Sequence, residues 1–314
     1  MSGFKLFVLF MFMLGSAGVC ATVLAQEDLS GSPPGLEYYS DYFSFAGRDE
    51  KGHVAFAIDN NRGRDGDEYQ AEHFLVFHDE LEGWRKLKGN GLYGNEAGIL
   101  EGIPDSPHFR FSGTAAEGFT IHSETNGLKL ITKAIGKRIS RKGDEGVYVM
   151  GSDDAILELG NRTVKGRVIH EYLYRSGFNR LTRKSPTAFK DFHGIYLLVD
   201  GSGDLYFHHR KGTPTSISRN QDGFLFLDGA NTVLPFEKVT PSGYRLGLGL
   251  YRWPTRWEGL VIIDGRPGTL SIRTSRSKRV KTWVIGGFVM SIVEGILKID
   301  GKEYPLYGFA ELII

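Results

Sequence analysis

Short stretches of alternating hydrophobic and polar residues recur along most of the chain and predict β-strands. The clearest covers residues 244–250, where leucines face one way while an arginine and two glycines face the other. About nine such segments lie between residues 38 and 174, and about ten between residues 194 and 314. Beyond the N-terminal segment, no stretch has the period of an amphipathic helix. The pattern therefore predicts an all-β protein.

Four hairpins are predicted from turns rich in Asp, Asn and Gly. Each turn joins two apolar runs, as a tight connection between antiparallel strands requires. The turns lie at residues 125–127, 200–204, 264–268 and 300–302.

The strands fall into two sets, separated by a polar and basic stretch at residues 180–186 that ends in proline. Eight to ten antiparallel strands close a small barrel with room for one ligand. We therefore expect two tandem lipocalin-like antiparallel β-barrels, at residues 26–180 and 187–314. One long β-sandwich and a propeller are the alternatives, although no blade-sized repeat of roughly 40 to 50 residues is visible.

Residues 1–25 have the pattern of a secretory signal peptide. Lys5 precedes an apolar run that is too short to cross a bilayer as a helix, and small residues ending at Ala25 follow. Cleavage there would remove Cys20, the only cysteine, so the mature chain would have no disulfide and no thiolate. A lipid anchor on Cys20 is the alternative. We expect a periplasmic or secreted protein.

Charge argues against a nucleic-acid partner. Once Lys5 leaves with the signal segment, basic and acidic side chains balance, whereas a nucleic-acid footprint needs a basic excess. Basic stretches at residues 133–142 and 273–281 are typical of solvated strand edges.

Both ends of the mature chain resemble one family. Residues 35–42 begin Gly-Leu-Glu-Tyr-Tyr, and residues 293–312 contain Glu-Gly followed by Gly-Phe-Ala-Glu-Leu. They are similar to the opening strand and closing hairpin of the lipocalin-like AttH and carotenoid 1,2-hydratase superfamily. Tyr38 and Tyr39 replace that family's tryptophan pair, and its central Trp-x-Asp-His-like motif has only residues 192–194 as a partial counterpart. The resemblance implies two barrels with an apolar ligand site in or between them, and relatives that hydrate or cyclise hydrophobic natural products.

Asp41 is the first candidate catalytic residue. The period of two places it on one strand face with Tyr39 and Phe43. Among aromatic side chains its pKa should be raised, because desolvation disfavours the charged carboxylate. A protonated carboxyl could then donate a proton to an alkene or an ether oxygen. Alternatively, the opposite face is the buried one and Asp41 lies in water.

His73 is the second candidate catalytic residue. It lies on the opposite strand face from His78, so at most one of the two can point into a barrel. A hydrogen-bonded core histidine is the alternative. Further along, His170 and Glu171 are adjacent and face opposite ways, which excludes a simple catalytic pair. No histidine or carboxylate stands at metal-ligand spacing, so we expect neither a metal nor a cofactor.

Aromatic residues are the candidate ligand-binding set. Trp253 and Trp257 are each preceded by an arginine and could line a pocket that grips a polar head group. A structural plug at one barrel end is the alternative. Tyr39, Phe43 and Tyr172 join the set because they share strand faces with Asp41 or His170.

Three functions are compatible with these features. The leading one is an exported protein that binds an apolar small molecule, such as a lipid or an isoprenoid, in or between the barrels. Membrane lipids are a further source of such a ligand. The second is a hydratase or cyclase that works by acid catalysis, and the third a structural module of the cell envelope. Oligomeric state is open.

Overall fold

The computed structural model describes residues 36–143, 146–177, 192–200, 203–210, 222–236, 238–246, 252–283 and 286–313. The expected signal peptide with Cys20 and the expected boundary at residues 180–186 lie outside these ranges. Of the strand expected at residues 244–250, Arg245–Leu246 forms a short strand and residues 247–250 lie outside the described chain.

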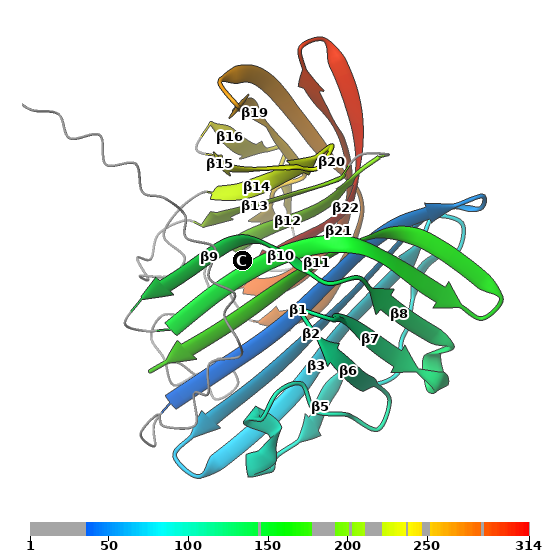
Figure 1. Ribbon diagram of the computed structural model, residues 1–314, viewed down its shortest axis with the longest axis vertical. Helices are drawn as coiled ribbons and strands as arrows, with labels where there is room; N and C mark the ends of the chain where they lie inside the picture. Colours follow the sequence, from blue (N-terminus) through cyan, green and yellow to red (C-terminus); the bar gives the residue numbers. More distant parts are fainter. Residues whose placement is uncertain are drawn as a thin grey trace, which may run out of the picture. The chain divides into compact units, whose positions relative to one another are not determined.

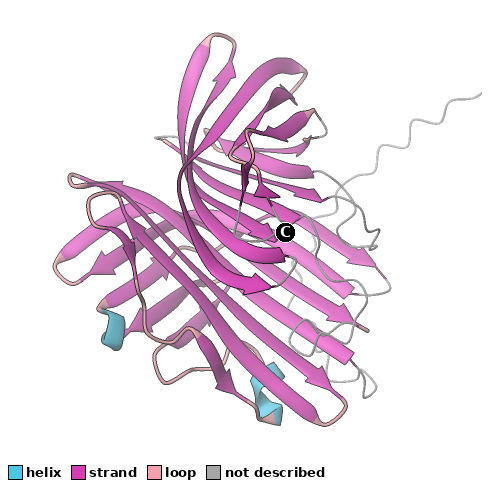
Figure 2. Cartoon of the chain, turned by 180° about the vertical axis from the view of Figure 1, so that it is seen from behind, coloured by secondary structure: helices cyan, strands magenta, loops and turns pink. Residues whose placement is uncertain are grey.

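Two large antiparallel sheets make up the described chain, and each curls along its strands into a half-barrel (Figures 1 and 2). The first sheet has eleven strands: β1 Leu36–Asp49, β2 Gly52–Asp65, β3 Glu68–Asp79, β4 Gly83–Arg85, β5 Gly91–Gly94, β6 Arg110–Thr114, β7 Gly118–Ser123, β8 Leu128–Thr132, β9 Gly136–Gly143, β10 Gly146–Leu159 and β11 Arg162–Ser176. Two short 3₁₀ helices, η1 Ala97–Leu100 and η2 Glu124–Asn126, lie within its connections.

The second sheet has nine strands: β12 Phe192–Val199, β13 Gly203–Arg210, β14 Asp222–Leu227, β15 Ala230–Pro235, β16 Val239–Ser242, β19 Arg256–Ile263, β20 Arg266–Trp283, β21 Gly286–Ile299 and β22 Lys302–Ile313. A separate two-stranded ribbon pairs β17 Arg245–Leu246 with β18 Arg252–Trp253. The expected all-β fold of two tandem lipocalin-like antiparallel barrels is thus confirmed, and each of the two is a curled sheet that forms a half-barrel.

Both sheets follow the same path. In each, the first strand pairs with the last, β1 with β11 and β12 with β22, and the remaining strands meander outward to both edges. The four predicted hairpins are present as β7–β8, β12–β13, β19–β20 and β21–β22. The Asp-Gly turns of β19–β20 and β21–β22 fit this geometry because Asp and Gly tolerate positive φ, as at Asp300 (50°) and Gly301 (78°).

Three hydrophobic clusters hold the sheets together. One fills the inside of each half-barrel, and the third lies between the sheets and contains side chains of both. In β1, Phe43 and Phe45 enter the first half-barrel whereas Tyr38 and Tyr42 enter the layer between the sheets. The central strands are therefore buried on both faces, whereas alternation alone suggested strands with one wet face.

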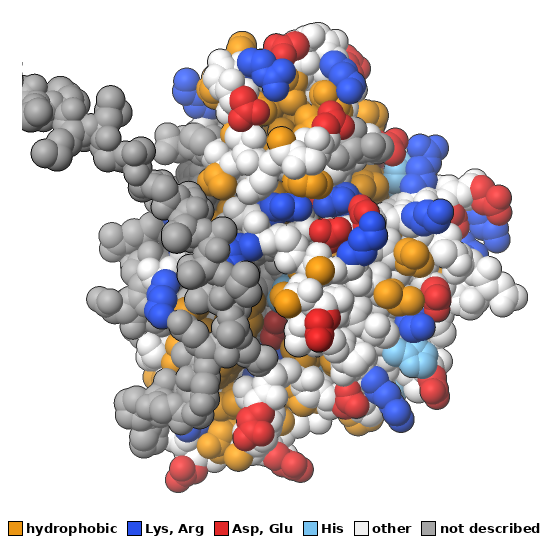
Figure 3. All heavy atoms as spheres, viewed as in Figure 1, with side chains coloured by type: hydrophobic (Ala, Val, Ile, Leu, Met, Phe, Trp, Pro, Cys, Tyr) orange, Lys and Arg blue, Asp and Glu red, His pale blue; other side chains and the backbone are white. Residues whose placement is uncertain are grey.

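Charged side chains of both signs are interspersed over the face shown in Figure 3, as the near-zero net charge suggests. Within the described ranges, no helix has the length and apolar character needed to span a membrane.

Candidate functional site

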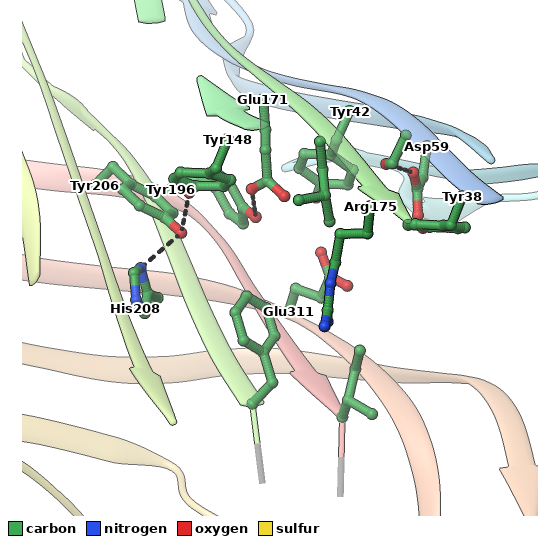
Figure 4. A pocket seen from close by; sticks show the side chains of 14 residues that line it. Tyr38, Tyr42, Asp59, Tyr148, Glu171, Arg175, Tyr196, Tyr206, His208 and Glu311 are labelled. Carbon is green, nitrogen blue, oxygen red and sulfur yellow. Dashed lines mark hydrogen bonds between the residues drawn. The ribbon is translucent and has the colours of Figure 1, made fainter. Parts of the chain in front are cut away.

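A small cavity lies between the two sheets, where their central strands face each other (Figure 4). Its volume is about 50 Å³, enough for a few water molecules at roughly 10–15 Å³ each on the same measure. It is lined by Tyr38, Ser40 and Tyr42 of β1, Asp59 of β2, Tyr148 of β10, Glu171, Leu173 and Arg175 of β11, Phe192 and Tyr196 of β12, Tyr206 and His208 of β13, and Glu311 and Ile313 of β22.

Phenol hydroxyls form a hydrogen-bonded chain along one wall. The Tyr148 hydroxyl lies 3.1 Å from that of Tyr206, which lies 3.2 Å from Nδ1 of His208. The Tyr196 hydroxyl donates to Oε2 of Glu171 over 3.2 Å. Tyr148 and Glu171 belong to the first sheet and the other three to the second, so both sheets contribute to this wall.

The phenols of this site are neutral over the physiological range. Burial raises the pKa of Tyr42, Tyr148, Tyr196 and Tyr206 well above the ordinary 10.0, and nearby carboxylates, Glu171 among them, add to the effect. A phenol that holds its proton is a hydrogen-bond donor. The cavity is therefore lined by hydroxyls that can hold the oxygen of a bound molecule.

Ionisable groups of both signs complete the lining. Arg175 and Glu311 are each 4% exposed, and Figure 4 shows both side chains pointing into the cavity. Asp59 accepts a hydrogen bond from the Ser40 hydroxyl at 2.8 Å. Carboxyl groups in such a place can act as general acids and bases, and a guanidinium and neutral phenols beside them can stabilise charge that develops in a reaction.

The predicted catalytic residues lie on the other face of the first sheet, in a second polar cluster. The Arg62 guanidinium donates to Oδ2 of Asp41 at 2.8 Å and to Oδ1 of Asn60 at 3.0 Å. The Asn60 amide nitrogen lies 3.2 Å from Nε2 of His73. The structure thus brings Asp41 and His73 into one network, linked through Arg62 and Asn60, but it places neither in the inter-sheet cavity.

The expectation that the pKa of Asp41 is raised is wrong. Burial alone would raise its pKa, but the Arg62 guanidinium and the hydrogen bond from Nε2 of His170 at 2.9 Å outweigh burial and lower the pKa below the ordinary 3.8. Asp41 is 5% exposed, so the alternative that placed it in water is wrong as well. An ionised carboxylate held by two cationic or donor groups is a structural anchor.

His73 is a neutral, buried imidazole. Burial, with further contributions from Arg62 and His108, lowers its pKa to about 3. Its ring packs against Tyr93 at 4.0 Å between centroids, and its Nδ1 has no hydrogen-bond partner among the described residues. His78 lies on the other face, between the sheets, as the period of two predicted.

The predicted ligand-binding aromatics are split between two half-barrels. Tyr39 and Tyr172 border the Asp41 cluster, and Phe43 stacks on His170 at 4.5 Å between ring centroids. Trp253 and Trp257 are 2% and 0% exposed and belong to the packed interior of the second half-barrel. Their part in binding a ligand stays a prediction of the sequence.

None of the residues that line the cavity was predicted from the sequence as a site residue. Glu171, Leu173 and Arg175 alternate on one face of β11, and that face was separated correctly from His170. The sequence does not show what packs against this face of β11. The strands opposite it, β12, β13 and β22, begin at Phe192, and nothing local in β11 points to them. In the described chain, no three metal-ligating side chains gather into a possible metal site.

No protein-family model matches the sequence, and no curated protein matches it. Solved structures do. A candidate AttH protein from Nitrosomonas europaea superposes with a TM-score of 0.56 and 13% identity, covering 94% of this chain and 97% of its own. Kievitone hydratase from Nectria haematococca superposes with a TM-score of 0.51 and 11% identity, covering 91% of each chain.

The chain has the AttH-like, lipocalin-type fold. This confirms at the level of the fold the resemblance seen in the two ends of the sequence. At such low identity the likeness concerns architecture alone.

Proposed function

We propose that this AttH-like chain is an acid–base enzyme of the hydratase or cyclase type, with its active site in the cavity between the sheets. The observation that carries the proposal is the lining: two carboxyl side chains, the half-buried Glu171 and the buried Glu311, together with Arg175 and a chain of neutral phenols. Kievitone hydratase, which shares the fold, is named for a water-adding reaction.

Glu171 and Glu311 are the acid–base pair of this proposal. Protonation of an alkene followed by attack of water needs one carboxyl to give a proton and one carboxylate to take a proton from water. The two side chains come from different sheets and face the same small space. Tyr148, Tyr196 and Tyr206 would hold the substrate oxygen, and Arg175 would balance the charge.

The chemical groups in the lining, rather than the size of the cavity, favour chemistry over storage. Sites that enclose a drug-sized ligand typically have about 300–1,000 Å³, so this cavity of about 50 Å³ would take only the reacting group of a substrate, beside its carboxyl, guanidinium and phenol groups. Side chains of the clusters pack the interiors of both half-barrels, including the two tryptophans. We therefore rank the hydratase or cyclase above the carrier of an apolar molecule, with the apolar compound as the expected substrate. Export stays a prediction of the sequence.

The test is turnover in labelled water. The protein is incubated in ¹⁸O-labelled, deuterated water with isoprenoid alkenes and their tertiary alcohols, and products are read by mass spectrometry. We expect ¹⁸O or deuterium in at least one compound class. Glu171→Gln and Glu311→Gln should each lower the rate by about 10²–10⁴-fold, the usual contribution of a positioned acid or base.

Glu158→Gln is the matched control, because the Glu158 side chain is half-exposed, its ion pair with Lys129 is 3.9 Å long, and it does not line the cavity. It should turn over at the wild-type rate. If every compound incubated with the wild-type protein is recovered without ¹⁸O or deuterium, the proposal is contradicted. Recovery of a bound, unconverted compound from the wild-type protein would favour the carrier. Glutamine variants that retain full rate would move the chemistry away from this cavity.

A further inference from the structure

A second polar site lies where the edge strand β4 meets the second sheet, outside the cavity lining. His78 of β3 is opposite Trp84 of β4, with their rings 5.0 Å apart in an edge-on arrangement. On the other side is β20, whose Lys278 ammonium lies 5.8 Å from the centroid of the Trp84 ring. Arg276, also of β20, lies against Gly83: its Nη1 is 3.2 Å from where a Cβ at Gly83 would stand.

Two buried N–H groups at this site have no acceptor among the described residues: His78 Nε2 and Trp84 Nε1. His78 Nδ1 lies 3.4 Å from the Tyr307 hydroxyl. With Nδ1 as the acceptor of that bond, Nε2 carries the proton and is a donor. Buried donors without acceptors are rare in proteins and need an explanation, such as an absent ligand or a bound water.

The site also has an excess of positive charge. The nearby carboxylates are already paired: Asp79 with Arg162 at 2.5 Å, Glu80 with His53 at 3.1 Å and Glu294 with Arg273 at 3.9 Å. Lys86, Arg276 and Lys278, by contrast, form no ion pair with any described residue.

The like charges act on each other and on His78. Burial and then the charge of Lys86 lower the pKa of the Lys278 ammonium. Burial and then Arg276 lower the pKa of His78 to about 4, against the opposing effect of Asp79 and Glu80. A bound negative group would relieve this repulsion and accept hydrogen bonds from both orphaned donors.

We propose that His78, Trp84, Lys86, Arg276 and Lys278 form a site for a small oxyanion, the carboxylate or phosphate group of a small molecule. The neutral indole and imidazole N–H groups would orient the oxyanion by hydrogen bonds, and the three cations would attract its negative charge. The site is independent of the proposed catalytic cavity, since none of the five residues lines that cavity.

The test follows the indole N–H signals of the full chain by ¹H–¹⁵N NMR, with the Trp84 signal assigned through Trp84→Phe. Inorganic phosphate and acetate are titrated separately against sodium chloride at the same ionic strength. We expect the Trp84 signal to move saturably with at least one oxyanion and the His78 pKa to rise in its presence. A response to phosphate alone or to both anions identifies the class of group.

Arg276→Gln and Lys278→Gln should each weaken that binding by about tenfold, the usual value of one charge-assisted hydrogen bond. Arg273→Gln is the matched control, because Arg273 lies on the same strand, is largely exposed and already pairs with Glu294. It should bind as the wild type does. A Trp84 signal that moves no more with phosphate and acetate than with chloride overturns the proposal, and so does unchanged binding in both glutamine variants.

Discussion

At the scale of single residues, burial and the neighbours it brings decide the protonation state of an ionisable group. Asp41 and Arg62 are 5% and 1% exposed, and their hydrogen bond is 2.8 Å long. Burying either charge without the other would cost free energy of folding. Together they are tolerated, because the two charges are opposite and are joined by hydrogen bonds. The sequence shows the aromatic neighbours of Asp41 on its own strand. Arg62 lies on the next strand, and its hydrogen bond with Asp41 favours the ionised carboxylate.

Replacing Asp41 should therefore cost stability. We expect Asp41→Asn to lower the free energy of unfolding by about 3–5 kcal/mol, because it leaves the buried Arg62 guanidinium without its counter-charge. Urea unfolding monitored by circular dichroism measures it. Glu303→Gln, whose pair with Lys298 is half-exposed, should cost less than about 1 kcal/mol. Equal, small losses for both would contradict the anchor role, and Asp41→Asn/Arg62→Gln should regain part of the loss.

His73 should make stability depend on acidity. Its pKa of about 3 in the folded chain is below the ordinary 6.5, so between these values the unfolded state binds more protons than the folded state. The free energy of unfolding should then fall as the pH drops from 6.5 towards 4, by up to about 1.4 kcal/mol per pH unit. His73→Gln should flatten that slope. An NMR titration midpoint of His73 near its ordinary pKa would contradict this.

At the scale of elements, turns carried the strongest local information. Asp-Gly pairs close β14–β15, β19–β20 and β21–β22, and each pair has positive φ at both positions. These are the dihedrals of the tight turns whose twist matches that of antiparallel strands. Two of these hairpins, β19–β20 and β21–β22, were therefore placed from the sequence.

Gly301 gives a direct test of the turn. Its φ is +78° and an added Cβ would contact nothing within 4 Å, so only backbone strain opposes a side chain. We expect Gly301→Ala to cost about 1–2 kcal/mol of unfolding free energy. Gly98→Ala has equally open surroundings without a positive φ, and should be neutral or slightly stabilising. Equal thermal shifts in the two variants would show that the turn imposes no strain.

At the scale of the whole molecule, polar contacts between the sheets matter as much as the apolar layer. Arg167 of β11 pairs with Asp204 of β13, and also lies 2.7 Å from Asp154. Burial raises the pKa of Asp204 even though Arg167 opposes this, because the carboxyl is 1% exposed. The pair links β11 of the first sheet to β13 of the second.

Arg167→Met should loosen this link in a pH-dependent way. Without Arg167, the buried Asp204 must be charged alone or hold a proton, and we expect a loss of about 3–5 kcal/mol at pH 7. A carboxyl with a raised pKa keeps a proton that the unfolded chain releases, so the loss should be smaller at pH 5. Urea unfolding at both pH values measures it, with Arg266→Met, an exposed pair, as the control. A loss that does not change with pH would contradict this account.

The sequence by itself determined the all-β class, the hairpins, the division into two sets of strands and the opposite faces of His170 and Glu171, because these depend on local alternation and turn chemistry. Tertiary structure alone decided which faces meet. Both faces of β1 and β11 are buried, so the aromatic face of Asp41 became a packed interior while the face of Glu171 met β12, β13 and β22. Strand periodicity names the residues on each face but contains no information about what lies against that face, and the candidate active site is made by that contact.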